Sequence, residues 1–257
     1  MLSDTQIREV FHFCFLERLL KLSGPSIYIL KGGVNLRFFF NSPRYSEDMD
    51  IDVLAGSVAT LKKNGYKILQ DAAFKRSLRL FDIEDIEIND PNKAKQTTTT
   101  QRFRFTLITP AGHRLPTKVE FSRRKQGMAD DAPLQLIDPE IARRYRKLAY
   151  RCRHYPGEVA VAQKIKALAG RTVTQARDVF DLAILFTGGY TPSTTKHSLI
   201  PKPQLAQAID CLMGLTWGDY QGQIVEFLDS ESRAEYGTES AWKSLQAIVL
   251  DTLAENA

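Results

Sequence analysis

Cysteine is scarce in this chain of 257 residues, which contains three, at positions 14, 152 and 211. So few and so widely spaced, they exclude a disulfide framework and a cysteine-based zinc cluster, and they fit a reducing cytoplasm. Long apolar runs are missing too, since stretches such as Phe38, Phe39 and Phe40 are far too short to cross a bilayer. The basic and apolar segments of a secretory signal are also lacking at the start. We therefore expect a cytoplasmic protein without a membrane partner.

The composition is otherwise that of an ordinary globular protein, with 43% hydrophobic and 25% charged residues. Its net charge of +5 is unevenly distributed. Residues 138–177 carry ten Lys and Arg against three Asp and Glu, whereas residues 178–257 carry four against eleven. This distribution makes the basic middle segment a candidate surface for polyanions, with a solvated charged face as the alternative.

Apolar periodicity predicts a mixed first part of the chain. A helix is expected before Gly24 and Pro25, and a second helical stretch over residues 57–80, interrupted at Asn64 and Gly65. The predicted strands cover residues 26–30, 49–54, 81–88, 102–109 and 114–122, the last two joined as a hairpin.

The second part of the chain is expected to be helical. After Asp138 and Pro139 the pattern predicts helices to the end, broken only by loops near residues 155–157, 187–203 and 237. We therefore predict an α+β fold made of two domains, residues 1–137 and residues 138–257.

A glycine pair carries the main chemical signal. Gly32 and Gly33 follow the first predicted strand and open a helix, where backbone N–H groups favour phosphate. Asp50 and Asp52 are two residues apart on the next strand, so their side chains point to one face. Two close carboxylates repel each other unless a cation lies between them, and such hard oxygen ligands suit Mg²⁺ bridging to substrate phosphates. The alternative is the wet face of a half-exposed strand.

A third carboxylate is expected on a neighbouring strand, because two metal ions can clamp both oxygens of a phosphoryl displacement. Glu87 and Glu120 each lie between two apolar residues. We favour Glu120, which lies on the longer hairpin strand and shares its face with Lys118, a cation that can meet a phosphate or tune the carboxylate. Glu87 is the alternative.

Two blocks of the sequence resemble the AbiEii-like nucleotidyltransferases, a family of the DNA polymerase β-like superfamily that includes toxins of abortive-infection, type IV toxin–antitoxin systems. Residues 30–33 and 43–52 are similar to the family's KGG turn and its R-aromatic-S-E-D-x-D-x-D segment. Residues 163–182 are similar to the pattern K-x-x-A-L-x-x-R … R-D-x-x-D-L. Val34 and Asn35 depart from the Thr and the small residue usual after the glycine pair.

The resemblance implies a polymerase β-like nucleotidyltransferase core, a mixed sheet with flanking helices, followed by a helical C-terminal domain. The activity implied is transfer of NMP from an NTP to an acceptor, an RNA and specifically a tRNA 3′ end, with growth arrest relieved by a cognate antitoxin. The implied metal site holds two Mg²⁺, or Mn²⁺ in their place, on Asp50, Asp52 and Glu120, and Glu120 also helps to deprotonate the attacking hydroxyl.

The resemblance also assigns residues to the nucleotide. The triphosphate is held by Lys31, Gly32, Gly33 and Ser46. Lys164 reaches it from the helical domain, and Asp178 and Asp181 border the site. Spacing alone leaves a second interpretation of this block, an interhelical salt bridge that includes Arg171 and Arg177.

A basic run with interleaved tyrosines is the candidate RNA surface. Its cations are Arg143, Arg144, Arg146, Lys147, Arg151 and Arg153, and its tyrosines are Tyr145, Tyr150 and Tyr155. Guanidinium groups bind phosphates, and tyrosines can stack on unpaired bases. The alternative is a solvated helix face that its tyrosines anchor to the core.

Two rival functions remain. The same transfer can modify a protein side chain or a small-molecule hydroxyl, in which case charge reversal at Arg143, Arg144 and Arg146 leaves activity intact. A nucleotide- or RNA-binding module without catalysis would instead keep its RNA binding after Asp50 and Asp52 are replaced, and its wild type would be inactive.

Overall fold

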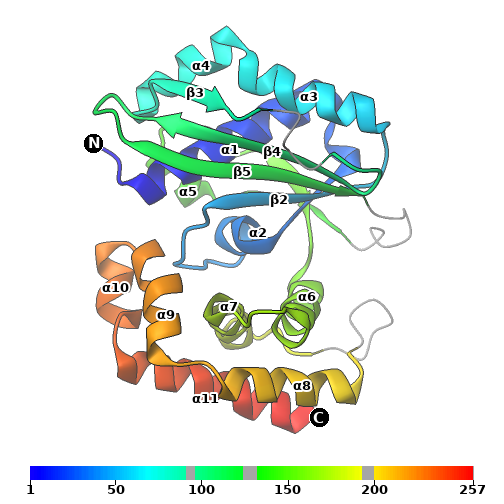
Figure 1. The fold of residues 1–257 in the computed structure, drawn as a ribbon, viewed down its shortest axis with the longest axis vertical. Coiled ribbons are helices and arrows are strands. Elements are labelled where there is room, and N and C mark those ends of the chain that lie inside the picture. The colour runs from blue at the N-terminus through cyan, green and yellow to red at the C-terminus, as the bar shows by residue number, and fades with distance from the viewer. Residues whose placement is uncertain (91–95, 124–131, 193–199, 257) are drawn as a thin grey trace. The chain divides into compact units, whose positions relative to one another are not determined.

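A single mixed sheet of seven strands organises the first part of the chain (Figure 1). The computed structural model describes residues 1–90, 96–123, 132–192 and 200–256. The strands are β1 (Tyr28–Lys31), β2 (Asp48–Val53), β3 (Asp85–Ile88), β4 (Thr100–Ile108), β5 (Arg114–Arg123), β6 (Leu134–Leu136) and β7 (Arg151–His154). Their order is β3–β4–β5–β2–β1–β7–β6, with parallel pairing in β2–β5 and β1–β7 and antiparallel pairing elsewhere. The predicted α+β class and the predicted hairpin are confirmed.

Helices cover the apolar face of this sheet. They include α1 (Asp4–Ser23), α3 (Val58–Gln70) and α4 (Ala72–Leu78). Figure 1 shows α3 and α4 along strands β3 and β4, with α1 behind them. From α1, Phe11 packs on Phe105 of β4 with ring centroids 4.9 Å apart, and from α3, Tyr66 packs on Phe103 at 5.0 Å. Burial of these large rings fixes which face of the sheet is core and leaves the other face to polar side chains.

The expected interruption at Asn64 and Gly65 is wrong, because α3 runs through both residues. Gly65 lies directly against Phe103, where an added Cβ would come within 2.3 Å of the ring. Glycine here permits close packing of helix on strand and does not end the helix. The helix ends at Gln70, and the carboxylate of the next residue, Asp71, accepts a hydrogen bond from the Phe74 N–H and caps α4.

Gly65→Ala is expected to destabilise the chain by about 1–3 kcal/mol, because the added methyl group overpacks the contact with Phe103. The matched control is Gly170→Ala, since nothing lies within 4 Å of the position that its Cβ would take. We expect the control to be neutral or slightly stabilising. Urea midpoints measure both, and equal midpoints for the two variants would contradict this packing role.

Strand β7 differs from the helical structure expected after Asp138, and β6, which precedes that residue, was not predicted. Helix α5 (Pro139–Arg144) is short, and β7 then pairs in parallel with β1. Cys152 and His154 of β7 are buried, whereas Arg151 is exposed. Four residues are too few to reveal a period of two, and the strand depends on a partner more than 100 residues away in sequence.

The chain divides into two compact units that do not follow the expected boundary after residue 137. Unit 1 comprises Met1–Phe39 and Tyr45–Tyr155, and unit 2 comprises Phe40–Arg44 and Pro156–Ala257. Unit 1 extends to Tyr155 because β6 and β7 complete its sheet. The segment Phe40–Arg44 connects α2 (Gly32–Phe39) with β2 in sequence, yet belongs to unit 2.

Unit 2 is a bundle of helices. Its helices are α6 (Gly157–Gly170), α7 (Ala176–Thr187), α8 (Lys202–Met213), α9 (Trp217–Gln223), α10 (Ser230–Tyr236) and α11 (Glu239–Asn256). Helix α7 is almost wholly buried and packs against α6, α9 and α11. Trp242 of α11 stacks on Tyr220 of α9 at 4.7 Å and is part of the core. None of the helices in the described residues combines the length and the hydropathy that a membrane span needs.

Candidate active site

Carboxylates from two adjacent strands face one side of the sheet in unit 1. On β2 the residues Met49 and Ile51 are buried in the core, so the side chains at positions 48, 50 and 52 point to the opposite face. Strand β5 lies parallel to β2 and places Glu120 directly opposite Asp50. The predicted partners Asp50 and Glu120 are therefore neighbours.

The alternative third carboxylate, Glu87, lies on β3, which β4 and β5 separate from β2. Its side chain is exposed and paired with Arg114, which holds the pKa of Glu87 below its usual value. The strand order therefore favours Glu120 as the carboxylate next to Asp50.

The glycine turn lies directly beside Asp50. Gly32 adopts φ +69°, a left-handed conformation that favours glycine, and an added Cβ would lie 3.1 Å from Asp50 Oδ2. Helix α2 starts at this residue, so the N–H groups of its first turn have no partner within the helix. Gly32 is thus required both for its backbone conformation and for its closeness to the carboxylate.

The Asp50 side chain has no hydrogen bond or ion pair with any residue that the structure describes. Burial raises the pKa of its carboxyl group, and Glu120 and Asp48 add to that rise, whereas Lys31 and Lys118 oppose it. Lys31 and Lys118 are thus near the Asp50 carboxylate, but neither forms an ion pair with it. A desolvated carboxylate without a partner is poised to bind a cation.

Asp52 has a different environment from Asp50, although both were expected to bind the metal ion from one face of the strand. Its side chain is 2% exposed. Lys31 Nζ donates to its Oδ1 at 2.6 Å, and the Tyr155 hydroxyl donates to its Oδ2 at 2.8 Å. Lys31, expected at the triphosphate, is therefore ion-paired to Asp52.

Asp48 is the accessible acid on the other side of Asp50, and the sequence analysis did not assign it a role. Its carboxylate accepts a hydrogen bond from Lys118 Nζ at 2.7 Å, and its side chain is 29% exposed. The same period of two that selected Asp50 and Asp52 includes Asp48, so the signal was present in the sequence. Ser46, expected at the triphosphate, donates its hydroxyl to the Asp48 carbonyl.

A buried polar network holds Tyr155, whose hydroxyl donates to Asp52. Asn35 of α2 donates to the Tyr155 carbonyl at 3.0 Å, and its Oδ1 lies 3.0 Å from His154 Nδ1. The His154 ring stacks on Phe39, and burial lowers its pKa to about 4. The neutral imidazole therefore serves as a hydrogen-bonding scaffold. Asn35, a departure from the family pattern, thus helps to fix the residue that holds Asp52.

The second sequence block forms a separate charged cluster within unit 2. Asp178 and Asp181 of α7 are fully buried. Lys164 Nζ of α6 lies 3.1 Å from Asp178 and 2.5 Å from Asp181. Arg171 donates to Asp178 at 2.7 Å, so the salt bridge between helices α6 and α7 is present.

Arg44, the arginine of the R-aromatic-S-E-D segment, completes this cluster, a role that the sequence analysis did not assign to it. Its guanidinium donates to both carboxylate oxygens of Asp181, the shorter contact being 2.9 Å. Burial opposes ionisation of Asp181, but Arg44 and Lys164 outweigh it and hold the pKa of Asp181 below its usual value. Phe40 packs edge-on against Tyr190 in the same unit. These contacts explain why Phe40–Arg44 belongs to unit 2.

The tyrosines of the basic run are turned inward and are not stacking platforms. Tyr145 and Tyr155 are buried, and Tyr150 is partly buried. Their hydroxyls donate to Glu9, the Phe13 carbonyl and Asp52. Since the run spans α5, a turn and β7, it does not form one helix face.

The predicted RNA-binding cations mostly have partners of their own in unit 1. Arg143 pairs with Glu140, and Lys147 pairs with Glu17 at 3.0 Å. A further cation, Arg144, donates to the Tyr45 and Glu9 side chains. Arg146 is exposed, at a left-handed φ of 51°.

The donor set on β2 and β5 fits a hard cation, although it is not preassembled. Within the described part of the chain, no group of three or more His, Cys, Asp or Glu is placed to hold a metal ion. Lys118 and Arg102 instead neutralise Asp48 and Glu120, the latter pair at 2.6 Å, while the Asp50 side chain has no partner among the described residues. Oxygen ligands from two adjacent strands are what Mg²⁺ prefers.

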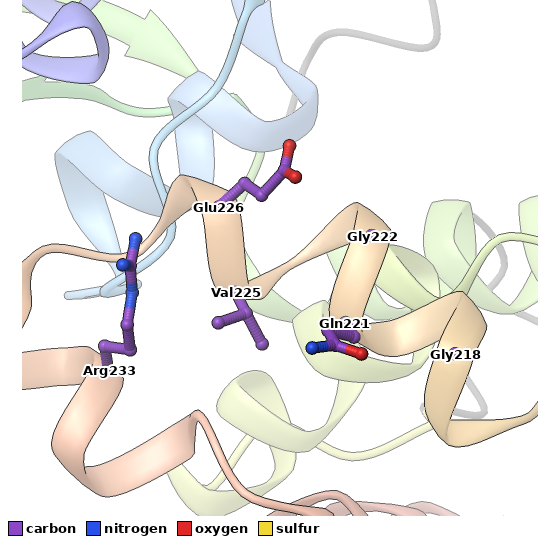
Figure 2. Close-up of a pocket in the computed structure, with 6 residues that line it drawn as sticks. All are labelled: Gly218, Gln221, Gly222, Val225, Glu226 and Arg233. Carbon is purple, nitrogen blue, oxygen red and sulfur yellow. The ribbon is translucent and has the colours of Figure 1, made fainter.

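A hollow of different character lies in unit 2 (Figure 2). It has a volume of about 370 Å³ and is lined by Gly218, Gln221, Gly222, Val225, Glu226 and Arg233. Figure 2 shows Glu226 and Arg233 extending from separate segments of the chain. None of the predicted site residues is among these described lining residues, so the hollow is not part of the candidate active site.

Comparison with known proteins identifies a family. The model of the nucleotidyl transferase AbiEii toxin, type IV toxin–antitoxin system, matches residues 14–204. This range includes the glycine turn, strands β2 and β5 and the charged cluster of unit 2. No curated protein matches the sequence.

Solved structures resemble the chain in fold. MenT4, the nucleotidyltransferase toxin Rv2826c from Mycobacterium tuberculosis H37Rv, is 16% identical over 98% of this chain and 84% of that chain, with a TM-score of 0.63. A candidate nucleotidyltransferase from H. pylori is 18% identical over 100% of this chain and 99% of its own, with a TM-score of 0.50. JHP933 from Helicobacter pylori is 18% identical over 100% and 96%, with a TM-score of 0.49. At these identities the likeness concerns the fold alone.

Proposed function

Because this chain belongs to the AbiEii family of nucleotidyltransferase toxins of type IV toxin–antitoxin systems, we propose that it transfers NMP from an NTP to the 3′ end of a tRNA. Pyrophosphate leaves, and the acceptor hydroxyl forms the new phosphodiester bond. The observation that carries this proposal is Asp50, a desolvated carboxylate without a partner among the described residues, next to a glycine turn at the start of a helix.

We place the proposed metal site on Asp48, Asp50 and Glu120. Bound Mg²⁺, with Mn²⁺ as its substitute, supplies charge stabilisation to both oxygens of the displacement. Asp48 and Glu120 reach such a site when Lys118 and Arg102 turn away from them. Asp52, expected as a ligand, is buried under Lys31 and Tyr155 and here serves to position the strand.

The phosphate-binding role of the glycine turn rests on backbone groups. Gly32 and Gly33 begin α2, and the first N–H groups of a helix attract anions. Lys31 immediately precedes them and is held by Asp52, which fixes its ammonium group near this turn. Ser46, Lys164, Asp178 and Asp181 keep their proposed roles at the nucleotide, and Lys164 has two carboxylates that orient its ammonium.

Membership in a type IV family also supports a cognate antitoxin as partner. We propose that transfer to tRNA arrests growth and that the antitoxin relieves this arrest. Both substrates are cytoplasmic, so the reaction belongs in that compartment.

The wild-type chain is expected to incorporate label into tRNA. The purified protein is mixed in turn with each α-labelled NTP, Mg²⁺ and total cellular tRNA, and labelled RNA is resolved on a denaturing gel. We expect at least one NTP to label tRNA, because Asp50 and Glu120 lie opposite each other and would hold the metal ion that the transfer uses. A parallel reaction with EDTA tests metal dependence.

Other outcomes separate the rivals. Label in protein or in a small molecule, with none in RNA, would show that the acceptor is that molecule and not a tRNA. Nucleotide binding without label in any acceptor would favour a binding module without catalysis. Undiminished labelling in EDTA would contradict the metal site.

A further inference from the structure

We propose that the phosphodiester backbone of the RNA acceptor lies on the open face of β4 and β5, along a strip formed by Arg102, Arg104, Arg114 and Lys118. This inference rests on the proposed function, because it takes the acceptor to be RNA. It names a binding surface different from the basic run at residues 143–155.

The pairing of the strands places the strip next to the candidate metal site. Across the sheet, Asp50 is opposite Glu120, and Glu120 is opposite Arg102. Two residues further along each strand, Lys118 is opposite Arg104. Directly opposite residues share a face, so these cations and the carboxylates lie on the same side of the sheet.

The other face of these strands is core. Phe103, Phe105 and Phe121 point into it and are at most 1% exposed. Alternation along β4 therefore directs Arg102 and Arg104 away from the helices that cover the core. Within unit 1, the face that carries the strip presents Arg104 to solvent.

No intramolecular contact among the described residues accounts for the charge of Arg104. Within the described residues it has no ion pair or side-chain hydrogen bond, and its side chain is exposed. Arg114 pairs with Glu87, but both side chains are more than half exposed, and such surface pairs contribute little to stability. Two of the four cations are thus accessible without breaking a buried contact.

The remaining two cations are held by the proposed metal ligands. Lys118 pairs with Asp48, and Arg102 pairs with Glu120. Ligands that coordinate a divalent ion no longer neutralise these cations, so the strip becomes more positive when the site is filled. The acceptor and the metal-bound nucleotide are thereby favoured together.

The chemistry of the strip favours contact with a phosphate backbone over contact with bases. Its other outward positions on the two strands, Thr106 and Pro116 among them, include no aromatic side chain for stacking. Arg102 and Arg104 are two residues apart, about 6.6 Å along the strand, a spacing that suits successive phosphates of an extended RNA. Arginine forks bind phosphate in a bidentate way, so we expect contacts that do not depend on sequence.

Charge reversal of Arg104 tests the strip. Fluorescence anisotropy of labelled bulk tRNA measures binding, and steady-state transfer gives KM for tRNA and for NTP separately. Arg104→Glu is expected to weaken tRNA binding on the order of tenfold, because a charge-assisted phosphate contact is replaced by repulsion. The slope of log affinity against log salt should fall by about 1, whereas KM for NTP should not change.

Arg76→Glu is the matched control, since Arg76 of α4 is also exposed and has no ion pair among the described residues. Equal loss of tRNA binding in both variants would overturn the strip and indicate a general charge effect. Unchanged tRNA binding in Arg104→Glu would overturn it as well. Each of these results is separate from failure of the proposed function, which appears as a wild type that transfers no label to RNA.

Discussion

Asp50→Asn is expected to reduce NMP transfer on the order of 10³-fold or more, because a metal ligand worth several kcal/mol of transition-state stabilisation is replaced by a neutral amide. The same change should leave the fold intact. The Asp50 side chain has no hydrogen bond or ion pair with described residues, and its carboxylate is desolvated, so no stabilising contact is lost. Unfolding of the variant by urea should thus begin no earlier than unfolding of the wild type.

The matched variant is Asp52→Asn, which removes a carboxylate that has two partners, whereas that of Asp50 has none among the described residues. Asp52 is buried and holds Lys31 and Tyr155, so its replacement should destabilise the chain by about 2–4 kcal/mol. Urea midpoints and transfer rates measured on both variants distinguish a functional from a structural carboxylate. Retained transfer in Asp50→Asn, or a loss of its stability as large as that of Asp52→Asn, would contradict the assignment.

The second large effect is expected at Arg44, which lies outside the metal site. Arg44→Met should destabilise unit 2 by about 3–5 kcal/mol, because one partner of a buried, bidentate pair is lost. The Arg44 and Asp181 side chains are 6% and 0% exposed, so water replaces little of the missing interaction. Lys164 alone then neutralises Asp181, and it is shared with Asp178.

Arg171→Met provides the control for Arg44, since it removes the outer cation of the same cluster. Arg171 is 38% exposed and makes one hydrogen bond to Asp178, so its loss should cost under about 1 kcal/mol. Hydrogen exchange of the α7 amides reports the local stability of both variants. Similar protection in the two variants would show that Arg44 does not stabilise the bundle.

Local patterns were sufficient for the parts of the fold that depend on neighbours in sequence. The glycine pair, the alternation on residues 49–54 and the hairpin turn each predicted the correct element at the correct place. The family model confirms the resemblance that these motifs suggested. The acidic strand and the glycine turn could therefore be identified as the candidate site before any contact was known.

Errors arose where a local signal had a tertiary cause. Gly65 would mark a break in an isolated helix, but here it accommodates Phe103 of another strand. Residues 151–154 would extend a helical region, but they pair with β1. The tyrosines of the basic run resemble an RNA platform, but their hydroxyls are needed inside unit 1.

By itself, the sequence determined which face of each strand is polar and which residues could carry the chemistry, because alternation and glycine conformation are local properties. Only the tertiary structure decided which of those residues are accessible. It buried Asp52 beneath Lys31 and Tyr155 while leaving Asp50 without a partner among the described residues, and it joined Arg44 to Asp181 across 137 positions of sequence. Two aspartates on one face of a strand thus differ in chemistry. Burial and ion pairing set that difference, and both depend on segments that are distant in the sequence.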